Sequence, residues 1–398
     1  MLSHLRAYYN KNFSEEKYWL FLKRLDAICG MHIEFRVSET PVFLPSTLMQ
    51  AMVEAGREII LQLVNNRDYH GKAAQAIPAE FNVPNETPHP LFVAVDFGIV
   101  QVPEGGYAPR LIELQGFPTL FAFQPVQSVL FKEVFGLPAE CRFLLGGRDF
   151  EQYLLLFRAA VLGEHEPEHV VLMELDPEKQ KTRPDFLLTE HFCGIRTVNI
   201  RDVVKQGRSL FYHRDGKLTP IRRIYNRAIA DELVRSGAEL PFSFRDELAV
   251  EWAGHPNWFF RISKFSLPYI RHATVPRTFF LHEMSTPPDD LENWVLKPLF
   301  SFAGSGVIVS PAREQLDAVP AEQRQHYVLQ EKVEYGSFIE TPYGGTKAEV
   351  RIMFIWNDEL TPVANLVRLG RGKMMGVGHN KNMPWVGSSA GFYVPSET

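Results

Sequence analysis

Two apolar segments in the first third of the chain, LFVAVDFGIV (91–100) and RLIEL (110–114), decide the fold. Each is a run of apolar and β-branched residues of strand length, and the Gly- and Pro-containing segment PEGGYAP joins them. This pattern predicts an antiparallel strand pair whose loop is longer than a tight hairpin turn. Asp96 lies in the first strand and Glu113 in the second, with Gln115 two residues further on.

These three side chains are candidate metal ligands, because Mg²⁺ prefers oxygen donors and keeps its remaining positions for water and phosphate. Asp96 and Glu113 would supply the negative charge. Gln115 would add an amide oxygen on a side chain one methylene longer than that of asparagine. Alternatively, the carboxylates are polar positions on a half-exposed hairpin, and the strand pair alone does not separate the two interpretations.

Length and composition predict a folded protein with more than one structural unit. A chain of 398 residues exceeds what one hydrophobic core usually organises. With 45% hydrophobic and 22% charged residues, it has neither a disordered nor a collagen-like composition. The formal net charge of -5 provides no basic surface for nucleic acid, so an anionic ligand has to be held by a local cluster of cations.

The cysteines and the N-terminal segment predict a cytoplasmic protein. Cys29, Cys141 and Cys193 are odd in number and widely spaced, which favours reduced thiols over a disulfide framework or a Cys-rich zinc site. The first residues have no apolar core of signal-peptide length, and no long uncharged apolar run predicts a membrane span.

Periodicity and turn residues divide the chain into three blocks, 1–146, 147–262 and 263–398. The first block contains two predicted helices, one capped by Ser14 and closed by Gly30, the other running from about Ser46 to Val64. In the second block, strand and helix signals alternate, which predicts a small parallel sheet with crossover helices. These signals and a hairpin turning at Asp215-Gly216 lie at 169–175, 185–193, 196–200, 201–207 and 210–225.

The third block combines a lysine with a glycine-rich loop. The strand WVLKPL (294–299) carries Lys297, and the following loop lets backbone N–H groups surround an anion. The spacing fits neither the Walker pattern nor GxGxxG, so an ordinary strand-to-strand turn is the alternative. The residues of this candidate phosphate-binding loop are Ala303, Gly304, Ser305 and Gly306.

The order of the next elements resembles the ATP-binding half of the ATP-grasp family. A strand YVLQEKV (327–333) follows, then a long antiparallel pair, EVRIMFIWN (349–357) and LTPVANLVRL (360–369). In that family a strand lysine and a glycine-rich flap cover the phosphates of ATP, and a linker meets the adenine through its backbone. The resemblance implies nucleotide contacts by Lys264, Lys297, the loop 303–306, Gln330, Glu331, Lys332 and Val333, and by Glu334 with the ribose.

The metal-binding strand pair of that family lies at the C-terminal end of the module, where this chain has no matching pattern. VAVDFGIV and RLIELQGFPTL supply it near the N-terminus, an arrangement that resembles the circularly permuted ATP-grasp proteins, of which glutathionylspermidine synthetase is one. The resemblance implies an α/β and α+β protein with an ATP-grasp fold in permuted order, in which the middle block forms a pre-ATP-grasp parallel-sheet domain. It also implies that Asp96, Glu113 and Gln115 bind Mg²⁺.

Two arginines are candidate catalytic residues by family position. Arg351 lies two residues after Glu349, and Arg368 ends the neighbouring strand. Positioned cations stabilise the charge that develops on a transferring phosphoryl group and on a tetrahedral carbon. Exposed strand arginines are often only solvated, which is the alternative. In the tail, Arg371, Lys373, Asn380 and Asn382 are expected to close over the substrate.

The function implied is that of an ATP-dependent carboxylate-amine ligase, which forms an amide through an acyl phosphate and releases ADP and phosphate. Its partners would be ATP, Mg²⁺ and small-molecule carboxylate and amine substrates, with neither nucleic acid nor membrane involved. Two alternatives stay open. One is a phosphotransferase acting on a non-carboxylate acceptor, and the other is a degenerate, non-catalytic nucleotide-binding protein. The pattern predicts neither the substrates nor the oligomeric state.

Overall fold

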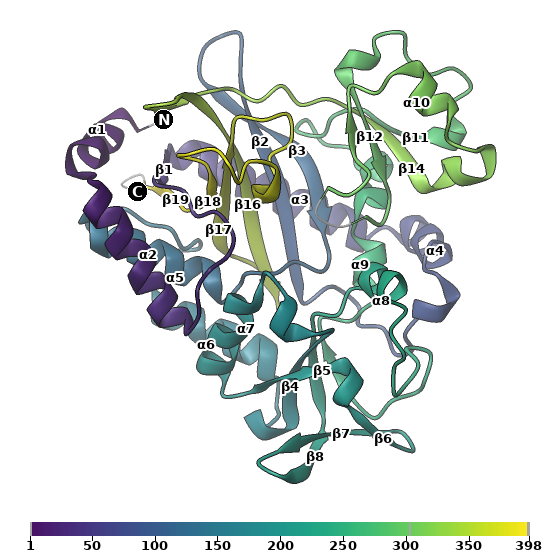
Figure 1. Ribbon diagram of the computed structural model, residues 1–398. Helices are drawn as coiled ribbons and strands as arrows, with labels where there is room; N and C mark the ends of the chain where they lie inside the picture. Colours follow the sequence, from purple (N-terminus) through teal and green to yellow (C-terminus); the bar gives the residue numbers. More distant parts are fainter. Residues whose placement is uncertain (1, 302–303, 396–398) are drawn as a thin grey trace.

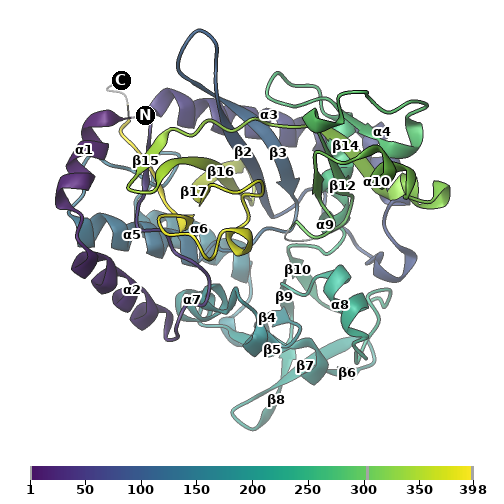
Figure 2. The same cartoon turned by 45° about the horizontal axis from the view of Figure 1, so that its top comes forward.

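The structure is a computed structural model that describes residues 2–301 and 304–395. Its centre is a six-stranded antiparallel sheet in the order β18-β17-β16-β2-β3, with β15 paired to β16. Figures 1 and 2 show the blue N-terminal strands beside the yellow-green C-terminal ones. The strands are β2 (Phe92–Gln101), β3 (Tyr107–Gln115), β15 (Ile339–Thr341), β16 (Gly344–Trp356), β17 (Leu360–Gly370) and β18 (Gly387–Ser389).

The predicted strand pair is confirmed, and it lies beside a strand from the C-terminal part of the chain. β2 pairs with β3 on one side and with β16 on the other, so that Asp96 lies opposite both Glu113 and Arg351. The register shifts after Asp96, which marks a bulge between β2 and β3. Because side chains alternate across a sheet, Asp96, Glu349 and Arg351 share one face, and Val95, Val350 and Ile352 share the other.

The two faces of the central sheet are covered differently. The helix α3 (Ser46–Val64), with the predicted bounds, packs against Val95, Val350, Ile352 and Phe354 on one face. One end of the opposite face carries Phe92, Met353 and Ile355 and lies in a cluster with five helices, which leaves its other end for a cavity. Those helices are α1 (Ser3–Asn12), α2 (Glu15–Cys29), α5 (Phe123–Phe135), α6 (Phe150–Leu162) and α7 (Arg183–Cys193).

Local signals placed the ends of α2 correctly. The Ser14 side chain accepts a hydrogen bond from the Lys17 backbone N–H, and Gly30 ends the helix in the left-handed conformation. Near the end of α2, Ile28 is exposed, whereas Cys29 is buried. Of the helices described, none has the length and apolar character needed to cross a membrane.

The predicted parallel sheet is also confirmed. Four parallel strands run in the order β10-β9-β4-β5, and α7 (Arg183–Cys193) is the crossover between β4 and β5. Segment 201–207 forms a turn and an edge strand, not a crossover helix, because it pairs with the hairpin that turns at Asp215-Gly216. The strands are β4 (Val170–Glu174), β5 (Arg196–Asn199), β6 (Val204–Gln206), β7 (Ser209–Arg214), β8 (Lys217–Ile221), β9 (Arg223–Asn226) and β10 (Glu251–Ala253).

A third sheet faces the central one across the cavity and is antiparallel, in the order β11-β14-β12-β13. The helix expected after Ser263 is a 3-10 helix, Lys264–Tyr269, which contains Pro268. The parallel pair β1 (Val42–Leu44) and β19 (Gly391–Tyr393) ties the chain ends together. The remaining elements are α4 (Arg67–Gln75), α8 (Ala230–Ser236), α9 (Trp258–Arg261), α10 (Arg313–Asp317), β11 (Thr278–Phe280), β12 (Trp294–Pro298), β13 (Ile308–Val309) and β14 (Tyr327–Glu331).

Candidate functional site

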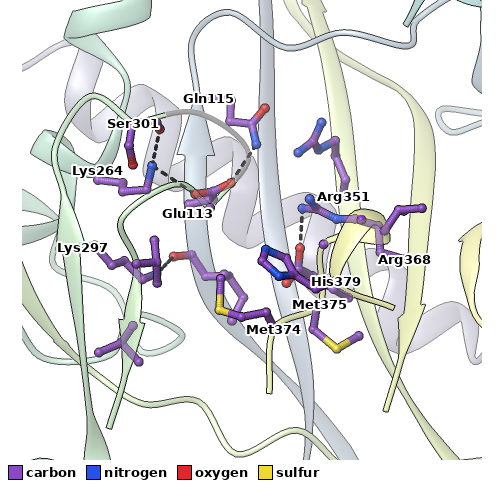
Figure 3. A pocket seen from close by; sticks show the side chains of 18 of the residues that line it. Glu113, Gln115, Lys264, Lys297, Ser301, Arg351, Arg368, Met374, Met375 and His379 are labelled. Atoms are coloured by element: carbon purple, nitrogen blue, oxygen red, sulfur yellow. Dashed lines mark hydrogen bonds and ion pairs between the residues drawn. The ribbon is translucent and has the colours of Figure 1, made fainter. Parts of the chain in front are cut away.

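A cavity of about 960 Å³ lies between the central sheet and the β11–β14 sheet. This volume is near the upper end of the range of about 300–1,000 Å³ that is usual for small-molecule sites. Its wall combines residues from β3, β12, β14, β16 and β17 with the tail loop 373–381. Figure 3 shows Glu113, Lys264 and Lys297 on one side, Arg351 and Arg368 across from them, and Met374, Met375 and His379 close by.

Two buried lysines and one carboxylate form the first side of the cavity. Lys264 Nζ donates to the carbonyl oxygen of Ser301 at 2.7 Å and lies 3.7 Å from Glu113 Oε2. Lys297 Nζ donates to the carbonyl oxygen of Ile112, the residue before Glu113, at 3.0 Å. Residues almost 200 positions apart thus meet here, and this group carries more positive than negative charge.

Burial and neighbouring charges shift the pKa values of this group. Burial, with a smaller effect of Lys264, lowers the pKa of Lys297 to about 8, although Glu113 opposes the shift. Burial by itself would raise the pKa of Glu113, but Lys264 and Lys297 lower it below its usual value. Glu113 is therefore an anion at neutral pH. Lys297 is mostly protonated at neutral pH and loses its proton about one pH unit higher.

On the other side of the cavity floor, two arginines and two carboxylates neutralise one another. Arg351 donates to Asp96 from Nε at 2.7 Å and from Nη2 at 2.8 Å, a bidentate pair. Arg368 Nη2 contacts Asp96 Oδ2 and also Glu349 Oε1. The Tyr335 hydroxyl donates to Glu349 Oε2 at 2.7 Å. We call Asp96, Glu349, Arg351 and Arg368 the charge quartet.

The pKa values within the charge quartet follow from the same competition. Burial would raise the pKa of Asp96, but Arg351 and Arg368 outweigh it and the pKa is lowered. For Glu349 burial prevails over the attraction of Arg368, and the pKa is raised. Burial alone would lower the pKa of Arg368, but the charges of Glu349 and Asp96 outweigh it, and the pKa is raised above its usual value. Asp96 and Arg368 are therefore fixed in their charged forms.

The predicted adenine-binding segment lies at the end of β14 and lines the cavity from Gln330 to Glu334. Backbone N–H groups of Glu331 and Lys332 are already used by the carbonyl oxygens of Arg277 and Asn293. Glu334 is exposed and pairs with Lys332. Gln330 is 2% exposed, and in the described part of the chain its Nε2 has no acceptor. A buried donor without a partner on a cavity wall suits an acceptor on a ligand.

The glycine-rich loop is only partly at the cavity. Gly304 lines it, with a positive φ of 76°, whereas Ser305 and Gly306 are exposed and are not among its lining residues. Ala303 lies outside the described residues. A Cβ added to Gly304 would lie 3.1 Å from Met374 Cε. The loop therefore meets the tail loop over the cavity.

Asn380 shapes that tail loop, a role different from the substrate contact expected for it. It is 1% exposed, and its Oδ1 accepts from the backbone N–H groups of Arg371 and Gly372. Its Nδ2 donates to the carbonyl oxygens of Met374 and Gly376. Arg371 in turn donates to Thr346 and Pro384. This network holds the loop that presents Lys373, Met374, Met375, His379 and Lys381 to the cavity.

The arrangement of the three candidate metal ligands distinguishes Glu113 from the others. Asp96 is 0% exposed with both oxygens bound by guanidinium groups, so a ligand role requires the arginines to move away. Gln115 Nε2 donates to Glu113 at 2.9 Å and to Asp96 at 3.3 Å. The described residues contain no cluster of three His, Cys, Asp or Glu that could hold a metal ion. Glu113, at the cavity wall, fits Mg²⁺ in the usual nucleotide arrangement of one or two protein carboxylates plus phosphates.

Two members of this site were not found from the sequence. Glu349 and Tyr335 complete the charge quartet and its hydrogen bonding. Glu349 had a usable signal, because it lies two residues before Arg351 on the same face of a strand. Tyr335 had none, since it approaches from the irregular segment after β14.

Comparison with known proteins bears on the fold. No family model and no curated protein matches the chain. The solved structure of a glutathione synthetase-like effector from Globodera pallida, in its apo form, matches with a TM-score of 0.59 and 12% sequence identity. The match covers 91% of this chain and 90% of that one. This chain shares a glutathione synthetase-like fold. At such low identity the likeness establishes the glutathione synthetase-like fold alone, and the activity has to be argued from the site.

Proposed function

We propose that the chain is an ATP-dependent ligase of ATP-grasp type that joins a carboxylic acid to an amine. The observation that carries the proposal is the meeting of Lys264, Lys297 and Glu113 beside segment 330–334 in a cavity large enough for two substrates. These residues come from three distant parts of the sequence. Their order along the chain supports a permuted ATP-grasp module, with β2 and β3 as its displaced strand pair.

In this proposal the nucleotide lies along the first side of the cavity. Segment 330–334 would receive the base, and Gln330 would give its free Nε2 hydrogen bond to it. Lys264 and Lys297 would bind the phosphates, because each supplies a charge-assisted hydrogen bond. Glu113, with Gln115 beside it, would hold the Mg²⁺ ion that neutralises phosphate charge when bound.

The reaction would proceed in two steps without a side-chain nucleophile. A carboxylate oxygen of the acid attacks the γ-phosphorus, the bond from that phosphorus to the bridging oxygen breaks, and ADP leaves. The amine nitrogen then attacks the acyl carbon, the bond to the phosphate oxygen breaks, and the nitrogen gives a proton to water. Arg351 and Arg368 would stabilise the developing negative charge once an anion replaces part of their contact with Asp96.

One observation favours a second candidate, a nucleotide-binding protein without catalysis. Both oxygens of Asp96 are bound by arginines, and Gln115 presents its amide nitrogen to the carboxylates. Such a protein would be stabilised by ATP but would not release ADP.

A screen for ADP release separates these functions. Pairs of acids and amines, drawn from amino acids, short peptides and polyamines, are tested with Mg-ATP. Release that requires both members supports the ligase, and release with the acceptor alone indicates a phosphotransferase. A thermal shift with ATP and no release in any pair indicates the non-catalytic protein. Glu113→Ala serves as the inactive control.

A further inference from the structure

The cavity has a second end, on the opposite side of the charge quartet from the proposed nucleotide. In the central sheet Glu113 lies opposite Asp96, Asp96 opposite Arg351, and Arg351 opposite Leu366 on β17. Two residues after Leu366, Arg368 lies opposite Ser388 on β18. Lys264 and Lys297 are at the β3 side of this row. The β17–β18 side is walled by Leu366, Arg368 and Ser388, and the tail loop lies over the cavity, where it also meets Gly304.

Lysines without a carboxylate partner also line the cavity. They come from three separate parts of the chain: Lys181 before α7, Lys347 on β16, and Lys373 and Lys381 on the tail loop. Within residues 2–301 and 304–395, none of the four forms an ion pair, although surface lysines and arginines elsewhere commonly do. Lys347 donates only to the carbonyl oxygen of Gly372, at 3.4 Å.

Few acidic groups oppose these lysines. Glu349 and Asp96 are already neutralised by the two arginines of the charge quartet, and Glu39 is paired with Arg36. Glu34 is an exposed acid on the same wall. In addition, Arg368 Nε is buried and has no acceptor within the described residues. An excess of cations together with an unused buried donor suits a ligand that brings several anionic oxygens.

We propose that this end of the cavity binds a carboxylic acid with at least two carboxylate groups, a polycarboxylate. This rests on the proposed function, in which one carboxylate is presented to the nucleotide phosphates near Arg368. The remaining carboxylate or carboxylates are held by Lys347, Lys373 and Lys381. Met374 and Met375 line the same cavity and can adapt to the carbon skeleton of the acid.

The same charges argue against a polyamine or a monocarboxylic acid at this end. A polyamine would bring further positive charge to a cluster of lysines, which like-charge repulsion disfavours. A monocarboxylic acid would displace water from several lysine ammonium groups but would pair with only some of them.

The lysines can be changed without disturbing the loop that carries them. The tail loop is held by Asn380 and Arg371 through backbone groups, and the side chains of Lys373 and Lys381 are exposed. Substitution of both lysines therefore removes charge from the wall and leaves the fold in place.

Calorimetric titration tests the proposal. Citrate, glutarate, butyrate and spermidine are titrated into the full chain with a Mg-bound, non-hydrolysable ATP analogue present, and the analogue is titrated first by itself. We expect citrate and glutarate to bind at least about tenfold more tightly than butyrate, with no displacement of citrate by spermidine. The Lys373→Ala/Lys381→Ala variant should lose about tenfold in citrate affinity and keep its affinity for the analogue. Lys373→Arg/Lys381→Arg and Lys217→Ala, the latter far from the cavity, should bind citrate as the unmodified chain does.

Several results would overturn the proposal: no binding of citrate or glutarate, equal affinity for butyrate, displacement of citrate by spermidine, or unchanged citrate affinity in the double alanine variant. The first titration is read separately. If the ATP analogue does not bind but citrate binding depends on the two lysines, the proposed nucleotide site fails and the polycarboxylate site stands.

Discussion

The two sides of the cavity floor treat charge in opposite ways. Lys264 and Lys297 face a single carboxylate, Glu113, and the pKa of Lys297 is lowered mainly by burial, with a smaller contribution from the charge of Lys264. In the charge quartet two arginines face two carboxylates, and every charge has a hydrogen-bonded counterpart. The first side is thus prepared for an incoming anion, whereas the second must exchange partners before it can bind one.

This difference assigns a structural task to the charge quartet. Asp96 and Arg351 are 255 positions apart in sequence, and their bidentate pair joins the N-terminal strands to the C-terminal ones. Buried ion pairs are costly to break from one side only, since the remaining charge is left without a partner. Asp96 therefore matters for folding, and Glu113 mainly for ligand binding.

The largest expected effect comes from removing the centre of the charge quartet. Asp96→Ala leaves the buried Arg351 without a counter-ion and Arg368 with Glu349 alone, and the free energy of unfolding should fall by about 3–5 kcal/mol. Denaturant unfolding followed by circular dichroism measures it. Glu113→Ala is the matched control on the neighbouring strand, with a smaller expected loss of about 1–2 kcal/mol. The Glu113 side chain is 23% exposed, and its Oε2 lies 3.7 Å from Lys264 Nζ, outside hydrogen-bond distance. Equal losses in the two variants would contradict the contrast drawn between the two sides.

A smaller loss is expected from the tail loop that carries the lysines of the second end. Asn380→Ala removes hydrogen bonds to four backbone groups of the loop, and unfolding free energy should fall by about 1–3 kcal/mol. Citrate affinity should fall with it, because the loop loses its shape. Asn382→Ala, at an exposed position two residues on, serves as control. If both variants behave alike, Asn380 does not organise the loop.

A pH dependence distinguishes the first side from the charge quartet. Burial lowers the pKa of Lys297 to about 8, so Lys297 is mostly charged at pH 7 and mostly neutral at pH 9. Affinity for the ATP analogue should fall by roughly tenfold from pH 7 to pH 9. The contribution of Lys297 to folding stability has the opposite sign. The unfolded chain keeps this proton up to about pH 10.4, so stability rises between about pH 8 and that value. In Lys297→Arg, calorimetry at several pH values should show an affinity for the ATP analogue that changes less between pH 7 and pH 9 than in the unmodified chain. The same pH dependence in both proteins would contradict the role of Lys297 in phosphate binding.

The smallest effect concerns the hydroxyl group that supports Glu349. Tyr335→Phe removes one hydrogen bond from a buried carboxylate and keeps the ring, so the loss of stability should be about 1–2 kcal/mol. Because Arg368 stays paired with Asp96, affinity for the ATP analogue should be unchanged. A loss as large as that of Asp96→Ala would show that Tyr335, and not the arginine pairs, holds the charge quartet together.

The elements that the sequence predicted well are those with local signals. The helix Ser46–Val64 has an uninterrupted apolar face, and the turn at Asp215-Gly216 needs only its two residues. The strand pair of Asp96 and Glu113 was found for the same reason. Segment 201–207 was misjudged, because its pairing with a later hairpin is not encoded within the segment.

The state of the candidate site depended on contacts that no local pattern contains. That Asp96 faces Arg351 follows from the register between β2 and β16, which a shift of one residue would abolish. Another buried carboxylate, Asp185, accepts hydrogen bonds from the backbone N–H groups of Leu120, Ala122 and Phe123, and it also had no sequence signal. The division into blocks 1–146, 147–262 and 263–398, the Mg²⁺ ligands and the cytoplasmic location stay predictions.

The central claim is that the first side of the cavity binds the phosphates of ATP. Titration of a Mg-bound, non-hydrolysable ATP analogue into the unmodified chain and into Lys297→Ala tests it most directly. We predict saturable binding to the unmodified chain and a loss of about 10- to 100-fold in the variant, with the folded structure retained in circular dichroism. Absence of binding to the unmodified chain, or equal affinity in both, would contradict it.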